Sequence, residues 1–203
     1  MTCKVINWEN VLHVNHRDYT MLTLTRVGIA IFTLAVVFGP LYTVADYSVV
    51  TNLISELGAQ HTQNNFIMII AFVILGGGIV IDGIRTFRVA LLPFIIFGMA
   101  MVVVGIFPHK PIDTSLSFNS TFHNIHGIIA SVSGTVITVG FIWQGFRANG
   151  KQRMVCFYMA MVAIVFPITM LNIPNYQGLT QRVMYLQILG WLWEKYPRSL
   201  VTA

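Results

Sequence analysis

The sequence predicts an all-α, polytopic membrane protein: a six-transmembrane-helix bundle with its N- and C-termini in the cytoplasm. The first observation behind this prediction is composition, because the 203 residues are 56% hydrophobic and only 9% charged. Soluble domains carry about 25% charged residues, so this chain cannot cover a water-facing surface. Membrane lipids are therefore the expected surroundings. The net charge of +5 comes from scattered residues, so no nucleic acid is expected as a partner.

The second observation is a series of apolar runs, each close to the roughly 20 residues that cross a bilayer. They define one transmembrane domain over residues 20–196, preceded by a cytoplasmic segment (1–19) and followed by a cytoplasmic tail (197–203). The sixth run is the shortest and most polar, since it contains Gln181, Arg182 and Gln187. The predicted helices cover about 20–42, 66–84, 88–107, 123–146, 152–173 and 179–196.

The third observation is the distribution of Lys and Arg, which sets the orientation. If the N-terminus is inside, the outer segments hold only Lys110 and Arg182. Positive charge concentrates on the cytoplasmic side of membrane proteins, so both termini are predicted inside. The plasma membrane is the expected location. The same asymmetry supports the sixth helix. The inner segments hold Lys4, Arg17, Arg26, Arg85, Arg88, Arg147, Lys151, Arg153, Lys195 and Arg198.

Both long connections lie on the predicted outer side, and long ordered loops tend to be functional. In the first loop, Asn52 and Glu56 are candidate ligand-binding residues, and Ser55 and Glu56 are candidate catalytic residues. Alternatively, Glu56 caps a short helix or forms a salt bridge. Arg182 is a further candidate ligand-binding residue at the outer start of the sixth helix. We expect it to pair with Glu56, because an arginine close to the apolar region is costly unless it is paired.

A second group of candidates surrounds the start of the fourth helix. His123 and His126 are three residues apart and so share one helix face, where they could bind one ligand. With His109 they could instead bind one metal ion. Asp113, which follows His109, is a third candidate catalytic residue. The face of His126 continues along a stripe of small residues, which would alternatively be a helix-packing seam. The stripe consists of Gly127, Ala130, Ser131, Gly134 and Thr138.

These polar groups come from separate segments but lie on one predicted side, which indicates one outward-facing polar pocket. The group consists of Glu56, His61, His109, Asp113, His123, His126 and Arg182. On the inner side, Asp82 is expected to pair with Arg85 or Arg88, with a proton-relay role as the alternative.

Several motifs resemble one family in the same order along residues 20–195. They are Tyr47-Ser48 with Asn52-Leu-Ile-Ser-Glu-Leu-Gly58, then Gly105-Ile-Phe-Pro108, then His123 and His126, then Gly178-Leu-Thr-Gln-Arg182. They are similar to domain-of-unknown-function family 998, a family of prokaryotic six-helix membrane proteins. The resemblance implies the fold and the choice of residues, but no reaction.

Three functions remain open from the sequence. The first is a binding or transport-type protein whose outward pocket holds a lipid headgroup, a small ligand or an ion. The second is a metal-dependent membrane hydrolase acting on a lipid or amide. Its histidines and acids would be similar in kind to the zinc sites of the alkaline ceramidase and adiponectin-receptor families, and bound zinc would activate water. The third is a haem-binding electron-transfer protein, which is disfavoured because the histidines cluster at one end. Enzyme activity, cofactor and oligomeric state stay undetermined.

Overall fold

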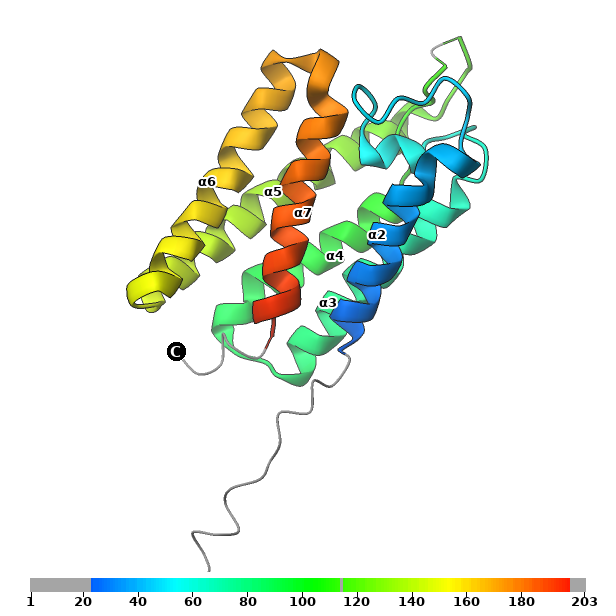
Figure 1. Ribbon diagram of the computed structural model, residues 1–203. Coiled ribbons are helices and arrows are strands. Elements are labelled where there is room, and N and C mark those ends of the chain that lie inside the picture. Colours follow the sequence, from blue (N-terminus) through cyan, green and yellow to red (C-terminus); the bar gives the residue numbers. More distant parts are fainter. Residues whose placement is uncertain (1–22, 114, 198–203) are drawn as a thin grey trace, which may run out of the picture.

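The computed structural model describes residues 23–113 and 115–197, and every regular element in this part of the chain is helical (Figure 1). This confirms the predicted all-α class, whereas the cytoplasmic location of the termini stays a prediction. The predicted segment 1–19 lies outside the described residues, as does the tail beyond Pro197. The α-helices are α2 (Leu24–Tyr42), α3 (Phe66–Arg85), α4 (Leu92–Ile106), α5 (Ser120–Arg147), α6 (Gly150–Asn172) and α7 (Gln177–Lys195). Three short 3-10 helices join them: η1 (Ile54–Gly58), η2 (Val89–Leu91) and η3 (Pro174–Tyr176).

The bundle has two unlike ends, which we call the termini end and the loop end. Residues 23 and 197 and the tight α3–α4 and α5–α6 connections lie at the termini end (Figure 1). Residues 43–65 and 107–119 form the long connections at the loop end. Each helix packs on the next one along the chain, and α7 also contacts α2. Short connections favour this neighbour packing of antiparallel helices.

Helix α5 begins three residues earlier than the predicted run, because a capping residue precedes the apolar pattern. The side chain of Asn119 accepts a hydrogen bond from the backbone nitrogen of Phe122 at 3.1 Å. Asparagine is among the preferred N-cap residues, since its side chain satisfies an otherwise unpaired amide of the first turn. The helix therefore carries His123 and His126 inside its first two turns rather than at its start.

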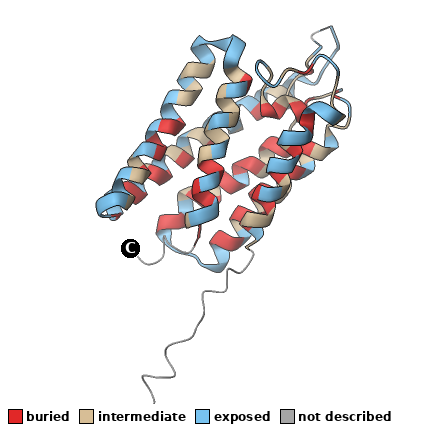
Figure 2. Ribbon diagram, viewed as in Figure 1, coloured by how far each residue is buried: buried red, intermediate tan, exposed pale blue. Residues whose placement is uncertain are grey.

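Exposed apolar side chains cover the outward faces of the helices, as expected for a surface in contact with lipid. Leu41 and Leu171 are 81% and 84% exposed, whereas the inward faces are buried (Figure 2). Five of the described helical segments are long and apolar enough to cross a membrane. They are α2, α3, Val89–Ile106, α5 and α6. These helices together identify a multi-pass membrane protein.

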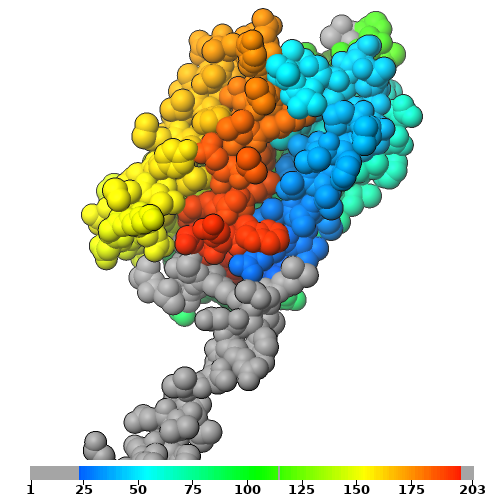
Figure 3. All heavy atoms as spheres, in the orientation of Figure 1, coloured from blue at the N-terminus to red at the C-terminus, as the bar shows by residue number. Residues whose placement is uncertain are grey.

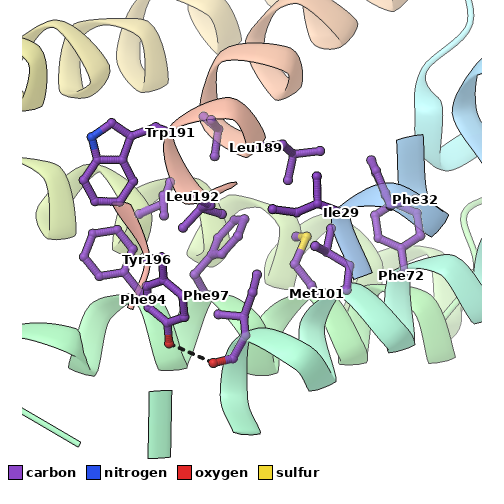
Figure 4. Packing of buried hydrophobic residues seen from close by; sticks show 14 of the residues in the cluster. Ile29, Phe32, Phe72, Phe94, Phe97, Met101, Leu189, Trp191, Leu192 and Tyr196 are labelled. Carbon is purple, nitrogen blue, oxygen red and sulfur yellow. Dashed lines mark hydrogen bonds between the residues drawn. The ribbon is translucent and has the colours of Figure 1, made fainter. Parts of the chain in front are cut away.

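Helix α7 is too polar for that group, and aromatic packing holds it in the bundle instead. Trp191 stacks on Phe94 of α4, with ring centroids 5.3 Å apart, and meets Phe141 of α5 edge-on at 4.9 Å. Just after α7, the hydroxyl of Tyr196 donates to the carbonyl of Ile79 in α3 at 2.8 Å (Figure 4). Aromatic pairs of this geometry add about 0.5–1.5 kcal/mol each beyond their buried area. Packing against α3, α4 and α5 therefore holds α7 in the bundle although its hydropathy is low.

Asp82 does not pair with Arg85 or Arg88, so the predicted ion pair is wrong for the described residues. Its Oδ2 atom accepts hydrogen bonds from the backbone nitrogen and the hydroxyl of Thr25, at 2.7 and 2.8 Å. Thr25 lies in the first turn of α2, where unpaired amides and the helix dipole favour a negative charge. The buried carboxylate of Asp82 thus joins α3 to the start of α2.

Candidate functional site

The first loop is held in shape by its own polar side chains. Glu56 accepts hydrogen bonds from the backbone nitrogen of Leu53 at 2.7 Å and from the side-chain amide of Asn52 at 2.9 Å. Asn52 in turn accepts from the backbone nitrogen of Ser48 at 2.8 Å. Glu56 therefore caps the short helix η1, which was the alternative interpretation of this residue. Its carboxylate and the Asn52 side chain stabilise the loop.

Arg182 fastens this loop to α7, but not through Glu56. One terminal guanidinium nitrogen donates to the carbonyls of Val49, Asn52 and Gly178 at 2.9, 3.0 and 2.9 Å. The other donates to the hydroxyl of Tyr47. The expected Arg182–Glu56 ion pair is wrong for the described residues, because Glu56 is occupied by the cap and loop carbonyls satisfy the arginine. Sequence reasoning had no way to find carbonyl partners, since every residue has one.

The backbone of α7 also lies directly against the loop. A Cβ atom on Gly178 would lie 2.3 Å from the carbonyl oxygen of Asn52, so only glycine allows this approach. The next backbone nitrogen, that of Leu179, donates to the carbonyl of Val50 at 3.0 Å. Arg182 and Gly178 together fix the position of η1 over the end of the bundle.

The structure brings the three predicted histidines together. The ring of His109 lies 4.5 Å from that of His123 and 5.4 Å from that of His126, centroid to centroid. Backbone atoms also contact these rings. Nδ1 of His126 lies 2.8 Å from the carbonyl oxygen of Phe107. The backbone N–H of Lys110 donates a hydrogen bond to Nδ1 of His123 at 3.4 Å. The cluster therefore packs the second loop against the start of α5.

The metal interpretation of this cluster gains no support from the geometry. Within residues 23–113 and 115–197, no group of three or more His, Cys, Asp or Glu side chains is arranged to hold a metal ion. Asp113 is fully exposed and accepts hydrogen bonds from the backbone nitrogen and hydroxyl of Ser115, at 2.9 and 2.7 Å, which lower the pKa of its carboxyl. His61 is also exposed, with a φ of 59° in the left-handed region.

We expect the histidine cluster to make the protein sensitive to mild acid. Burial, and then the neighbouring His126 and His123, lower the pKa of His109 from 6.5 to about 4. Between these values the unfolded state binds more protons than the folded state, so stability falls as pH drops from 6.5 toward 4. The loss from this group is at most about 1.4 kcal/mol per pH unit. The unfolding temperature of a His109→Asn variant should therefore depend less on pH over this window than that of the unmodified protein. The same pH dependence in both would mean that other groups cause the acid sensitivity.

A cavity of about 550 Å³ occupies the loop-end half of the bundle and opens to the bundle surface at exposed wall residues such as Ser131 and Ile164. Helices α5 and α6 diverge from their turn toward the loop end, as Figure 1 shows, and the cavity lies among α4, α5, α6 and α7 under η1. Its volume falls within the roughly 300–1,000 Å³ typical of small-molecule sites. Most of the wall is apolar. The polar or hydroxyl-bearing lining residues are Ser55, His126, Ser131, Ser133, Thr135, Thr138, Gln181 and Tyr185.

Most of the small-residue stripe of α5 borders this cavity, so within the described residues its interpretation as a packing seam is wrong. A Cβ atom on either Gly127 or Gly134 would meet no atom within 4 Å, whereas a seam requires close contact. Ala130, Ser131 and Gly134 instead line the cavity wall. Small side chains leave the volume that the cavity occupies.

Two buried serines give the cavity hydrogen-bonding capacity that the protein does not use. Ser55 and Ser133 are only 8% and 5% exposed, and both line the cavity. Neither hydroxyl has a hydrogen-bond partner among the described residues. Gln181 lines the same cavity; its Oε1 atom accepts from the backbone nitrogen of Ile54 at 2.6 Å, and its Nε2 atom has no partner within the described ranges.

Sequence reasoning named Ser55 and His126 but missed Ser133 and Gln181. A signal for Gln181 was present, because Gln181, Met184, Tyr185 and Ile188 recur at helical spacing and mark one face of α7. All four line the cavity.

A second groove, of about 460 Å³, runs between α2 and α7. These two helices and α6 form the face seen in Figure 3. Apart from Arg182 and Thr33, the groove is lined by apolar and aromatic residues and glycine. Its described lining has fewer hydrogen-bonding side chains than that of the cavity, so we build the candidate site on the cavity.

The comparisons with known proteins agree with the motif resemblance. A family model described as "Protein of unknown function (DUF998)" matches residues 26–193, from the first turn of α2 to the last turn of α7. No curated protein and no solved structure matches the chain.

Proposed function

The chain belongs to the DUF998 family, whose description names no activity, so we propose a function from the cavity of this membrane protein. We propose that the protein binds an amphipathic, lipid-like molecule among α4, α5, α6 and α7. The observation that carries the proposal is the arrangement of the cavity wall. Apolar side chains form most of it, while Ser55, His126 and Gln181 gather at the loop end. Ligand sites in proteins combine apolar walls with a few placed polar groups in this way.

The site is supported by unused hydrogen-bonding groups in an apolar region. Leaving a polar group unpaired in a buried site costs about 1–3 kcal/mol, so such groups are normally satisfied. The hydroxyls of Ser55 and Ser133 have no partner within the described residues and border the same cavity, where a ligand can reach them. A ligand that brings hydrogen-bonding atoms to these two hydroxyls and hydrocarbon to the apolar part of the wall would satisfy both.

Filling the cavity should remove the ligand. Gly134→Leu places a branched side chain in the cavity, and no atom within 4 Å of the new Cβ opposes it. We expect lipid that copurifies with the full-length protein to fall at least about tenfold, which corresponds to 1.4 kcal/mol or more of lost binding. Native mass spectrometry and quantification of solvent-extracted lipid measure this.

Gly77→Leu is the matched control, since Gly77 lies in α3, does not line the cavity and also has open space around its Cβ position. Equal lipid content in the two variants, with both folded, would overturn the proposal.

We also propose that the loop end, and with it the polar part of the cavity, faces outward from the plasma membrane. Basic residues at the termini end support this orientation, among them Arg26, Arg85, Arg88, Arg147 and Lys151.

An epitope after Ala203 should therefore stay inaccessible to antibody in intact cells until they are permeabilised. An epitope inserted between the exposed residues Ser115 and Leu116 should be accessible without permeabilisation. The opposite labelling pattern would place the cavity on the cytoplasmic side.

A further inference from the structure

None of the described residues that line the cavity is Asp, Glu, Lys or Arg. An isolated charge buried in an apolar site costs several kcal/mol unless a partner neutralises it. A phosphate, carboxylate or ammonium head group bound in this cavity would lack a formally charged partner in the wall. The lining therefore disfavours charged lipids, which make up most of a bilayer's head groups.

The charged side chains nearest in sequence to the lining residues are already engaged elsewhere. Glu56 follows Ser55, but its carboxylate accepts from Asn52 and Leu53. Arg182 follows Gln181, but its terminal nitrogens donate to loop carbonyls and to Tyr47. Using either group for a ligand would require breaking the contacts that hold the loop over the cavity.

Other hydroxyls in the wall are satisfied locally. Those of Ser131, Thr135 and Thr138 donate to the carbonyl four residues earlier, at 2.9, 3.0 and 2.7 Å. The hydroxyl of Tyr185 is 3.8 Å from the sulfur of Met101, a weak acceptor.

The unused hydroxyls and amide of the wall can all act as hydrogen-bond donors. Ser55 and Ser133 each have a free O–H, and the free atom of Gln181 is its amide nitrogen, which can only donate. The Gln181 assignment is fixed by its neighbour, because the backbone nitrogen of Ile54 can bond only to the amide oxygen. An uncharged oxygen acceptor is therefore the one partner type that could engage all three groups.

We infer that the ligand is an uncharged lipid whose head group presents carbonyl or ester oxygens to Ser55, Ser133 and Gln181. Diacylglycerol and isoprenoid quinones share this chemistry, whereas phospholipids carry a charged phosphate. This inference rests on the proposed function and adds the class of ligand to it.

Competition binding with the full-length protein in detergent tests the head-group class. A fluorescent diacylglycerol serves as the probe, and unlabelled diacylglycerol, phosphatidylglycerol with the same acyl chains, and an isoprenoid quinone serve as competitors. We expect at least one uncharged competitor to bind at least tenfold more tightly than phosphatidylglycerol. Comparing diacylglycerol with the quinone as competitors shows which of the two lipid classes supplies the acceptor oxygens.

Removing the donors tests the role of the head group. Ser55→Ala and Ser133→Ala should each weaken binding of the preferred uncharged lipid about 2- to 10-fold, which corresponds to the loss of one hydrogen bond. Ser120→Ala, the same substitution at an exposed position of α5 outside the cavity, should have no such effect.

The outcomes separate the inference from the proposed function. If phosphatidylglycerol binds as well as the uncharged lipids and Gly134→Leu abolishes both, the cavity binds lipid but the inferred class is wrong. If no lipid binds, or Gly134→Leu changes nothing, the proposed function fails as well. If Ser55→Ala and Ser133→Ala leave affinity unchanged, the assignment of the head group to these hydroxyls is overturned.

Discussion

Arg182→Ala should detach the first loop from α7 and lower the free energy of unfolding by about 2–3 kcal/mol. Hydrogen bonds to a charged group are worth about 1.5–3 kcal/mol, and this site is only partly buried. The substitution leaves the carbonyls of Val49 and Asn52 and the hydroxyl of Tyr47 without their shared donor. Since Ser55 lies in the same loop, ligand binding should fall too. Thermal unfolding in detergent and protease cleavage within residues 43–65 measure the two effects.

The geometry of the guanidinium predicts that lysine cannot replace it. Arginine presents a planar fork of donors, whereas lysine has one ammonium group that cannot reach all of these acceptors at once. Arg182→Lys should therefore recover less than half of the lost stability. Arg88→Ala removes an exposed arginine at the termini end and serves as the control. If Arg182→Ala were as stable as Arg88→Ala, the loop would not depend on this side chain.

Gly76→Ala should destabilise the bundle sharply, although it adds one methyl group. The new Cβ would lie 2.4 Å from the carbonyl oxygen of Gly98 and 2.8 Å from the backbone nitrogen of Val102. Both atoms belong to the backbone of α4, so α3 and α4 must move apart. Overpacking of this kind costs about 1–3 kcal/mol, and here no flexible side chain can yield.

The adjacent glycine gives the contrasting result. A Cβ on Gly77 would meet no atom within 4 Å, so Gly77→Ala should be neutral or stabilising by up to about 1 kcal/mol, the difference in helix propensity. Comparing the unfolding free energies of Gly76→Ala and Gly77→Ala tests the α3–α4 contact. Equal stability of the two variants would mean that the helices do not approach as closely as these distances indicate.

Local sequence properties determined the class of protein and the position of its helices. Apolar runs of membrane-spanning length require only hydropathy along the chain, and the tight basic turns follow from where those runs end. The histidine cluster could also be anticipated in part, because His123 and His126 share a helix face by spacing alone.

Only the tertiary structure decided what lies opposite each polar residue. Arg182 bonds to loop carbonyls rather than to Glu56, and Asp82 bonds to Thr25 rather than to an arginine. The small residues of α5 line a cavity instead of a seam, because α5 and α6 diverge toward the loop end. Helical periodicity states which face a residue occupies, but the partner of that face depends on packing between segments far apart in the chain. The sequence therefore determined a six-helix membrane protein, and the packing of its helices created the cavity.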